Sequence, residues 1–326
     1  PTGQGDSTQA FRDAIAAAQG GVVWIPPGDY KLTSSLNGVQ NVTLQGAGSW
    51  YSVVHTSRFI DQSSSVGNVH IKDFAVIGEV TERVDSNPDN FVNGSLGPNS
   101  SVSGMWIQHL KCGLWLTGTN DNLVVENNRI LDTTADGLNL NGTAKGVTVR
   151  NNFLRNQGDD SLAMWSLYAP PDTDSSFENN TISQPNLANG IAIYGGTNIT
   201  VKGNLVSDTN ALGSGIAISN QKFMDPFNPL AGTITVAGNT LVRAGAMNPQ
   251  LEPPDGRAAR RLLRQRDQRH GEHHRHHHHR QPLQRLRVRL RRRPRLPPSG
   301  TSPSAAPPSR TPARSSSSPR HRARPP

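Results

Sequence analysis

Short runs of alternating apolar and polar residues recur along the first 250 residues of the chain. Asn, Gly and Asp turns bound each run, and typical inward pairs are Val147/Val149, Ile199/Val201 and Ile234/Val236. Alternation with a period of two predicts β-strands that bury one face and expose the other.

These runs belong to a repeat. The asparagines Asn128, Asn152, Asn180 and Asn204 head the same turn and are spaced 24, 28 and 24 residues apart. A repeat of this length built from short strands is typical of a β-solenoid, whereas a leucine-rich repeat adds helical periodicity and a propeller blade needs about 40 residues. We therefore predict an all-β fold, a right-handed parallel β-helix.

The start of the chain predicts a helix over GDSTQAFRDAIAAAQGG (5–21), with Ser7 or Thr8 at its N-cap and Gly20 near its end. A strand, VVWI, and a turn, PPGDY, follow it. Because a parallel solenoid exposes an apolar end, we expect this helix to cap the fold. The segment resembles the entry to the pectate-lyase-like β-helix superfamily.

Charge divides the chain into two parts. Residues 1–250 contain 13 Lys and Arg against 20 Asp and Glu, whereas residues 251–326 contain 20 against 4. We expect a β-helix catalytic domain over 1–249 and a basic, disordered tail over 250–326. Because the globular part is acidic, we expect no nucleic-acid partner. Cys112 is the only cysteine and is predicted to be a buried thiol. No apolar stretch is long enough to predict a membrane span.

Three interpretations of the tail compete: a basic binding arm, a His-rich metal tract, and an out-of-frame translation. Reading HHRHHHHRQ (273–281) one nucleotide later permits a Thr- and Asp-rich segment that resembles another rung of the repeat. We hypothesise that the coding frame slips near residue 249, so that the C-terminal coils of the solenoid are missing. A nucleotide sequence without a rung-encoding alternative at that codon would contradict the hypothesis.

A group of carboxylates is the candidate chemistry. The turns ADGLNL (135–140), DDSLAM (159–164), ANGIAI (188–193) and GSGIAI (213–218) align on successive coils. Asp136 and Asp160 then stack about 4.8 Å apart, with Asp159 beside them. Like charges at that distance repel, so at least one pKa should be raised, as a general acid requires. The competing interpretations are turn-forming aspartates and a calcium site.

Five segments in this order resemble glycoside hydrolase family 87, the α-1,3-glucanases and mycodextranases: GEVTERVDS (78–86), WIQHLKCGLWLTG (106–118), DTTADGLNLNG (132–142), NQGDDSLAMW (156–165) and LANGIAIYGG (187–196). The resemblance implies that Asp136, Asp159 and Asp160 are the catalytic residues of a secreted enzyme that inverts the anomeric centre. Inversion implies carboxylates roughly 6.5–9.5 Å apart. No cofactor is implied, although structural calcium is compatible with it.

We assign Asp159 as general acid, with Asp136 and Asp160 activating water because they share register. Exchange of roles between Asp159 and Asp160 stays open. The predicted substrate-binding residues are Trp165, Tyr194, Asn139, Asn189, Trp106, Arg83 and Asp85. The aromatic rings among them, and that of Trp115, are either sugar platforms or core residues. Arg83 and Asp85 lie in a long insertion that forms a wall of the cleft, binds a cation, or does neither.

Three other functions are known possibilities for a parallel β-helix: a polygalacturonase-like hydrolase, a lyase, and a non-catalytic binding protein. A polygalacturonase-like enzyme would carry Gly-His-Gly and Arg-x-Lys motifs on the next rungs, which instead read NGIAIYGG and SGIAISN. A lyase would need a catalytic base, for which Arg155 is the only nearby candidate. A non-catalytic β-helix adhesin or carbohydrate-binding module is the third alternative. We expect a monomer that acts on an α-glucan polysaccharide.

Overall fold

The structure is a computed structural model that describes residues 1–18, 20–142 and 144–245. The basic segment 250–326, its predicted disorder and the proposed frame slip near residue 249 lie outside the described residues. Across the described ranges, no helix is long and apolar enough to cross a membrane.

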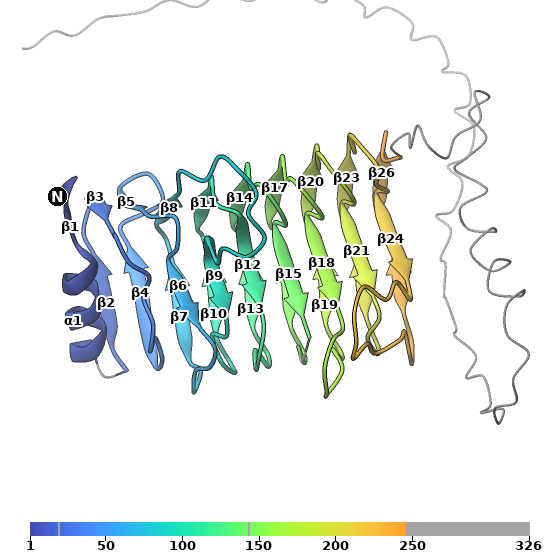
Figure 1. The fold of residues 1–326 in the computed structure, drawn as a ribbon, viewed down its shortest axis with the longest axis horizontal. Helices are drawn as coiled ribbons and strands as arrows, with labels where there is room; N and C mark the ends of the chain where they lie inside the picture. The colour runs from blue at the N-terminus through green and yellow to red at the C-terminus, as the bar shows by residue number, and fades with distance from the viewer. Residues whose placement is uncertain (19, 143, 246–326) are drawn as a thin grey trace, which may run out of the picture. The chain divides into compact units, whose positions relative to one another are not determined.

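The described chain winds as a right-handed parallel β-solenoid of about nine turns, which confirms the predicted fold. Its strands form three parallel sheets, which we call A, B and C (Figure 1). Each complete coil contributes one strand to sheet B, then one to sheet A, then one to sheet C. The corner that matters for function is the turn from sheet A to sheet C.

The strands of each sheet follow in their order along the solenoid. Sheet A contains β1 (Thr2–Asp6), β3 (Gly28–Lys31), β5 (Ser52–His55), β8 (Ala75–Ile77), β11 (Trp106–Gln108), β14 (Arg129–Leu131), β17 (Phe153–Arg155), β20 (Thr181–Ser183), β23 (Leu205–Ser207) and β26 (Thr240–Val242). Sheet B contains β2 (Val22–Ile25), β4 (Val42–Gly46), β7 (Val69–Lys72), β10 (Ser101–Ser103), β13 (Val124–Glu126), β16 (Thr148–Arg150), β19 (Ser176–Glu178), β22 (Thr200–Lys202) and β25 (Thr235–Ala237). Sheet C contains β6 (Ile60–Gln62), β9 (Asn90–Gly94), β12 (Cys112–Leu116), β15 (Leu138–Asn141), β18 (Leu162–Trp165), β21 (Ile191–Tyr194) and β24 (Ile216–Ser219).

The core consists of the inward positions of the three sheets, stacked from coil to coil. On sheet B, Val125, Val149, Phe177 and Val201 pair in register, and all four are fully buried. The alternation in the sequence therefore marks the buried face as predicted. Cys112 is a buried free thiol, also as predicted.

A ladder of buried asparagines fixes the turn from sheet B to sheet A. The Asn152 Nδ2 donates to Val125 O at 2.9 Å and to the Asn180 Oδ1 at 3.0 Å. The same pattern links Asn128 to Asn152 and Asn180 to Asn204. Each amide satisfies buried backbone groups that the turn leaves unpaired, which explains why the same residue recurs once per coil.

Helix α1 (Thr8–Ala18) lies at the N-terminal end of the solenoid (Figure 1). Phe11 is buried in the core, and Ala14, Ile15 and Ala18 pack against it. The predicted capping role is confirmed. The Thr8 backbone N–H donates to the Asp6 side chain at 2.9 Å. Asp6 lies one residue before the two predicted N-cap candidates, Ser7 and Thr8.

Candidate functional site

The three aspartates predicted as catalytic lie in turns from sheet A to sheet C. Asp136 lies between β14 and β15, and Asp159 and Asp160 lie between β17 and β18 on the next coil. Because Leu138 pairs with Leu162, Asp136 and Asp160 occupy equivalent positions on neighbouring coils. The register predicted from the ADG and DDS turns is confirmed.

The close approach of these two turns depends on Gly137. A Cβ at this position would lie 2.4 Å from the carbonyl oxygen of Ser161 and 2.7 Å from a methyl carbon of Leu154. The Gly137 N–H donates to the backbone carbonyl of Asp160 at 3.1 Å. A larger residue would separate the turns and, with them, the carboxylates of Asp136 and Asp160.

The three carboxylates form one cluster. One oxygen from each of Asp136, Asp159 and Asp160 lies within 4.8 Å of the other two. This distance is shorter than the separation of roughly 6.5–9.5 Å expected for an inverting pair. It refers to one oxygen of each group, however, and not to the distance between whole carboxyl groups.

Asp136 is the most strongly perturbed member of the cluster. It is only 6% exposed, and the Asn139 Nδ2 donates to its Oδ2 at 2.8 Å. Burial raises the pKa of Asp136 well above its usual value, and the negative charges of Asp160 and Asp159 raise it further. The raised pKa of Asp136 agrees with the expectation that at least one pKa in the cluster is raised.

Asp160 is also buried, but it has more donors. The backbone N–H and the Nδ2 of Asn189 donate to its Oδ1 at 2.7 and 2.8 Å. Burial raises the pKa of Asp160 to about 6, and the hydrogen bonds from Asn189 and Tyr194 oppose part of that shift. The same Asn189 amide donates to the Tyr194 hydroxyl at 3.0 Å.

Asp159 faces the solvent side of the cluster, with 25% of its side chain exposed. The Arg83 Nη1 donates to its Oδ2 at 2.6 Å, and the Arg83 Nε donates to Asp85 at 2.7 Å. Arg83 and Asp85 come from the segment between β8 and β9, so this insertion contacts the carboxylates directly. Of the interpretations left open for it, a wall of the site is the one that the contacts support.

The predicted aromatic residues separate into two locations. Trp165 and Tyr194 pair in register on sheet C, beside the carboxylates. Trp106 lies on sheet A, where its ring packs edge-on against Trp50 at 4.6 Å between centroids. The structure therefore brings Trp165 and Tyr194 to the site and does not bring Trp106 there.

A cavity of about 450 Å³ opens beside the cluster. Asp136, Trp165 and Trp115 line it on the solenoid side, and Arg83 and Asp85 line it on the insertion side. We call it the catalytic cavity. The Trp165 Nε1 and the Asn139 Oδ1 are buried polar atoms without a hydrogen-bond partner in the described residues.

The cluster also has the spacing of a possible cation site, because its three oxygens converge. Without an ion, Asp136 and Asp160 have raised pKa values, which means that they retain protons at higher pH than ordinary aspartates do. Arg83 already places a positive charge on Asp159. The cluster without an ion therefore has the properties that acid–base chemistry requires.

Residues 5–247 match the family model described as the α-1,3-glucanase catalytic domain D2. The chain belongs to glycoside hydrolase family 87. No curated protein matches the chain.

Solved structures, two of them described as family 87 α-1,3-glucanases, are similar to this chain. The catalytic unit of a thermostable α-1,3-glucanase from Streptomyces thermodiastaticus strain HF3-3 is 87% identical, with a TM-score of 0.76, and the match covers 77% of this chain and 46% of that one. The Agl-KA catalytic domain is 28% identical, with a TM-score of 0.66, over 73% of this chain and 45% of that one. A family 87 catalytic domain in complex with nigerose shares the fold at 24% identity and a TM-score of 0.61, over 72% and 44%. The chain thus spans about half the length of these relatives.

One residue that packs against the site was not among the predicted residues. Phe223, 56% exposed, packs edge-on against Trp165 and Tyr194 at 5.2 and 5.1 Å between centroids. It comes from the loop after β24, which carries no motif of the repeat. Trp115, whose ring the sequence left open as a sugar platform or a core residue, pairs with Asn139 on sheet C and lines the catalytic cavity.

Proposed function

We propose that this chain hydrolyses α-1,3-glucosidic bonds in a glucan polymer and inverts the anomeric centre. The observation that carries the proposal is the cluster of Asp136, Asp159 and Asp160 at one end of an aromatic-lined cavity. Family membership and the 87% identity to an α-1,3-glucanase catalytic unit support it. Inversion rests on the family resemblance.

In the proposed mechanism, Asp159 is the general acid because it is the most exposed member of the cluster. It donates its proton to the glycosidic oxygen while the bond from that oxygen to C1 breaks. Asp136 and Asp160, which lie on consecutive coils and are more deeply buried than Asp159, hold a water molecule that attacks C1. One of this pair takes the proton released by the water, so the reaction yields one new reducing end and no covalent intermediate.

The hydrogen bonds around Asp160 support the part that this scheme gives it. Asn189 donates twice to Asp160 and so stabilises the ionised form that a base requires. Asp136 has a single side-chain donor, Asn139, and retains its proton more strongly. Arg83 is a positioning residue in this scheme: it orients the Asp159 carboxyl group, and the ion pair must open for Asp159 to donate a proton to the glycosidic oxygen.

A neutral substrate fits the catalytic cavity better than a uronate does. The two basic residues that line it are Arg83 and Lys111, and both are engaged. Arg83 is paired with Asp85 and Asp159. The Lys111 Nζ donates to the backbone carbonyls of Asp85 and Asn87. Among the lining residues described, no cation is left to bind the carboxylate of a galacturonate.

The test is reducing-sugar release from α-1,3-glucan, mixed α-1,3/α-1,4-glucan and polygalacturonate. We expect release from at least one of the two glucans and none from polygalacturonate. Single Asp136→Asn, Asp159→Asn and Asp160→Asn variants should each lose activity, whereas an adhesin or carbohydrate-binding module would bind glucan with all three dispensable. Proton NMR of the first products tests inversion: β-anomers appear first if it occurs. The pH–rate profiles of the separate variants test which aspartate is the acid.

A further inference from the structure

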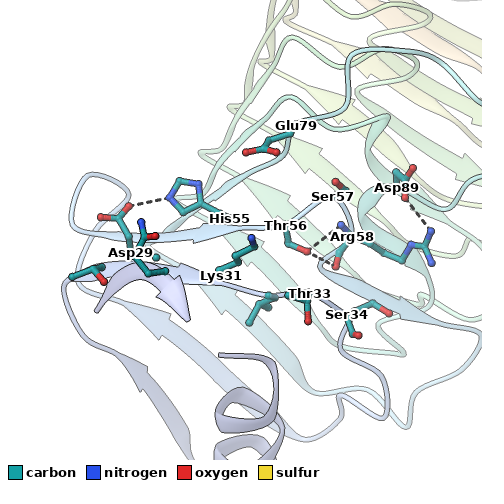
Figure 2. Close-up of a pocket in the computed structure, with 15 residues that line it drawn as sticks. Asp29, Lys31, Thr33, Ser34, His55, Thr56, Ser57, Arg58, Glu79 and Asp89 are labelled. Carbon is teal, nitrogen blue, oxygen red and sulfur yellow. Dashed lines mark hydrogen bonds and ion pairs between the residues drawn. The ribbon is translucent and has the colours of Figure 1, made fainter. Parts of the chain in front are cut away.

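A second, larger cavity lies near the N-terminal end of the solenoid (Figure 2). It measures about 670 Å³, and its lining includes Lys31, Thr56, Ser57 and Glu79. In Figure 2 the Lys31 side chain lies between His55 and the Thr33 hydroxyl, with Glu79 across the cavity. We call this space the distal cavity.

The distal cavity lies on the same corner of the solenoid as the carboxylates. Thr56 and Ser57 occupy the turn between β5 on sheet A and β6 on sheet C, as Asp136 occupies the turn between β14 and β15. Strand β6 is followed by β9, β12 and β15 in sheet C. Three steps of about 4.8 Å therefore separate the two turns by about 14 Å along the solenoid.

One segment borders both spaces. In the insertion between β8 and β9, Glu79 and Asp89 line the distal cavity. Arg83 and Asp85, from the middle of the same insertion, line the catalytic cavity. The two cavities are thus consecutive sections of one corner, on either side of a single wall.

The charges of the distal cavity favour a neutral ligand. His55 lies 2.9 Å from Asp29, and Arg58 lies 3.0 Å from Asp89. These charged groups are satisfied by each other, so they offer no net field for an anion. The remaining lining is rich in hydroxyl groups and contains one amine, Lys31, that forms no ion pair with any described residue. Hydroxyls and amines donate to, and carboxylates accept from, the hydroxyl groups of a sugar.

We propose that the distal cavity is a glycan-binding subsite that holds the α-1,3-glucan chain several sugar units away from the bond being cleaved. The proposal rests on the proposed function for the identity of the glycan. Binding energy from remote parts of a substrate improves turnover only when the substrate reaches them. Long oligosaccharides should therefore depend on the distal cavity, and the shortest substrates should not.

The test uses the full chain with the double substitution Lys31→Ala and Glu79→Ala. Neither side chain forms a hydrogen bond or an ion pair with a described residue, so its loss leaves no partner unsatisfied. The matched control is Glu178→Ala with Lys202→Ala, a pair in register on sheet B. Loss of two hydrogen bonds should lower kcat/KM on an α-1,3-linked octasaccharide about tenfold. The shortest oligosaccharide that is cleaved should change less than about twofold, and the control should change neither.

A binding arm separates failure of this proposal from failure of the proposed function. An Asp160→Asn background removes turnover, and calorimetry then measures octasaccharide binding with and without the distal substitutions. Weaker octasaccharide binding in the double variant supports the subsite even if the parent cleaves nothing. Three results would overturn the proposal. The double substitution could leave octasaccharide binding unchanged, or it could lower kcat/KM equally on short and long substrates. It could also weaken the binding of inorganic phosphate, measured in the same way, but not that of the octasaccharide.

Discussion

Asn189→Ala is the substitution that most directly tests how the protein sets the protonation of its base. The Asn189 Nδ2 donates to Asp160 at 2.8 Å, and its backbone N–H donates to the same oxygen at 2.7 Å. The substitution removes the first bond and keeps the second. Because the lost bond favours the ionised carboxylate, the pKa of Asp160 should rise from its value of about 6.

The size of the shift follows from the energy of a hydrogen bond to a charged group. Such a bond contributes about 1.5–3 kcal/mol, and one pKa unit corresponds to about 1.4 kcal/mol. Since the backbone donor remains and water can enter the space vacated by the amide, we expect a shift of about one unit. The ionised fraction of Asp160 at pH 6 then falls from about one half to about one tenth.

The assay is kcat/KM on α-1,3-glucan oligosaccharides from pH 4 to pH 9. A base must be ionised to act, so activity falls as the pH drops through the pKa of Asp160, and raising that pKa moves the acidic limb upward. We expect Asn189→Ala to lose about fivefold at pH 6 and little at pH 8. Asn186→Ala is the control, because its amide donates to Asn156 and not to a carboxylate. An acidic limb that stays in place, or one that moves downward, would refute the reasoning.

Three further predictions follow from the buried polar groups. Asp136→Asn should lower kcat by about a thousandfold and raise Tm by a few degrees, because it removes a buried carboxyl from beside two others; activity assays and calorimetry measure the two effects. Asp172 is buried, its Oδ2 has no partner in the described residues, and burial raises its pKa to about 8. Its neutral form therefore stabilises the fold fully below pH 4, and this contribution is lost as the pH rises through 8. The difference in Tm between Asp172→Asn and the parent should therefore be about 5 °C larger in favour of the variant at pH 9 than at pH 5. Asn152→Ala should cost about 3 kcal/mol in urea unfolding, whereas Asn210→Ala, which removes one exposed amide, should cost under about 1 kcal/mol.

The fold was predictable because each coil repeats the same local solution. Asn128, Asn152 and Asn180 recur once per coil since every coil must satisfy the same buried backbone groups at the same turn. That constraint also set the register that placed Asp136 beside Asp160. A feature repeated for a physical reason can be counted along the chain, and counting was sufficient to locate the acidic cluster.

The parts of the site that escaped prediction come from segments that do not repeat. Phe223 reaches Trp165 from a loop whose path no periodicity determines. Arg83 was singled out in its insertion, but its bond to Asp159 joins residues 76 positions apart and has no counterpart on other coils. The location of Trp106 on sheet A follows from its strand, β11, because tryptophans on different strands of one coil face different sides of the solenoid.

Repetition of the backbone explains why equivalent aspartates differ in protonation. Asp136 and Asp160 occupy equivalent backbone positions, but the Asn189 N–H donates to Asp160, whereas the equivalent N–H, that of Asp160, donates to Asp159. Their pKa values differ through this backbone bond and through the side chains on adjacent coils. On the coil before Asp136 the equivalent residue is Cys112, which is buried and donates no hydrogen bond to Asp136. On the coil after Asp160 the equivalent residue is Asn189, which donates to the Asp160 carboxylate. A proton therefore resides preferentially on Asp136, toward the catalytic cavity, and the negative charge resides on Asp160. The side chains on adjacent coils contribute to which of the two aspartates holds the proton, so single substitutions there can shift it without any change in the fold.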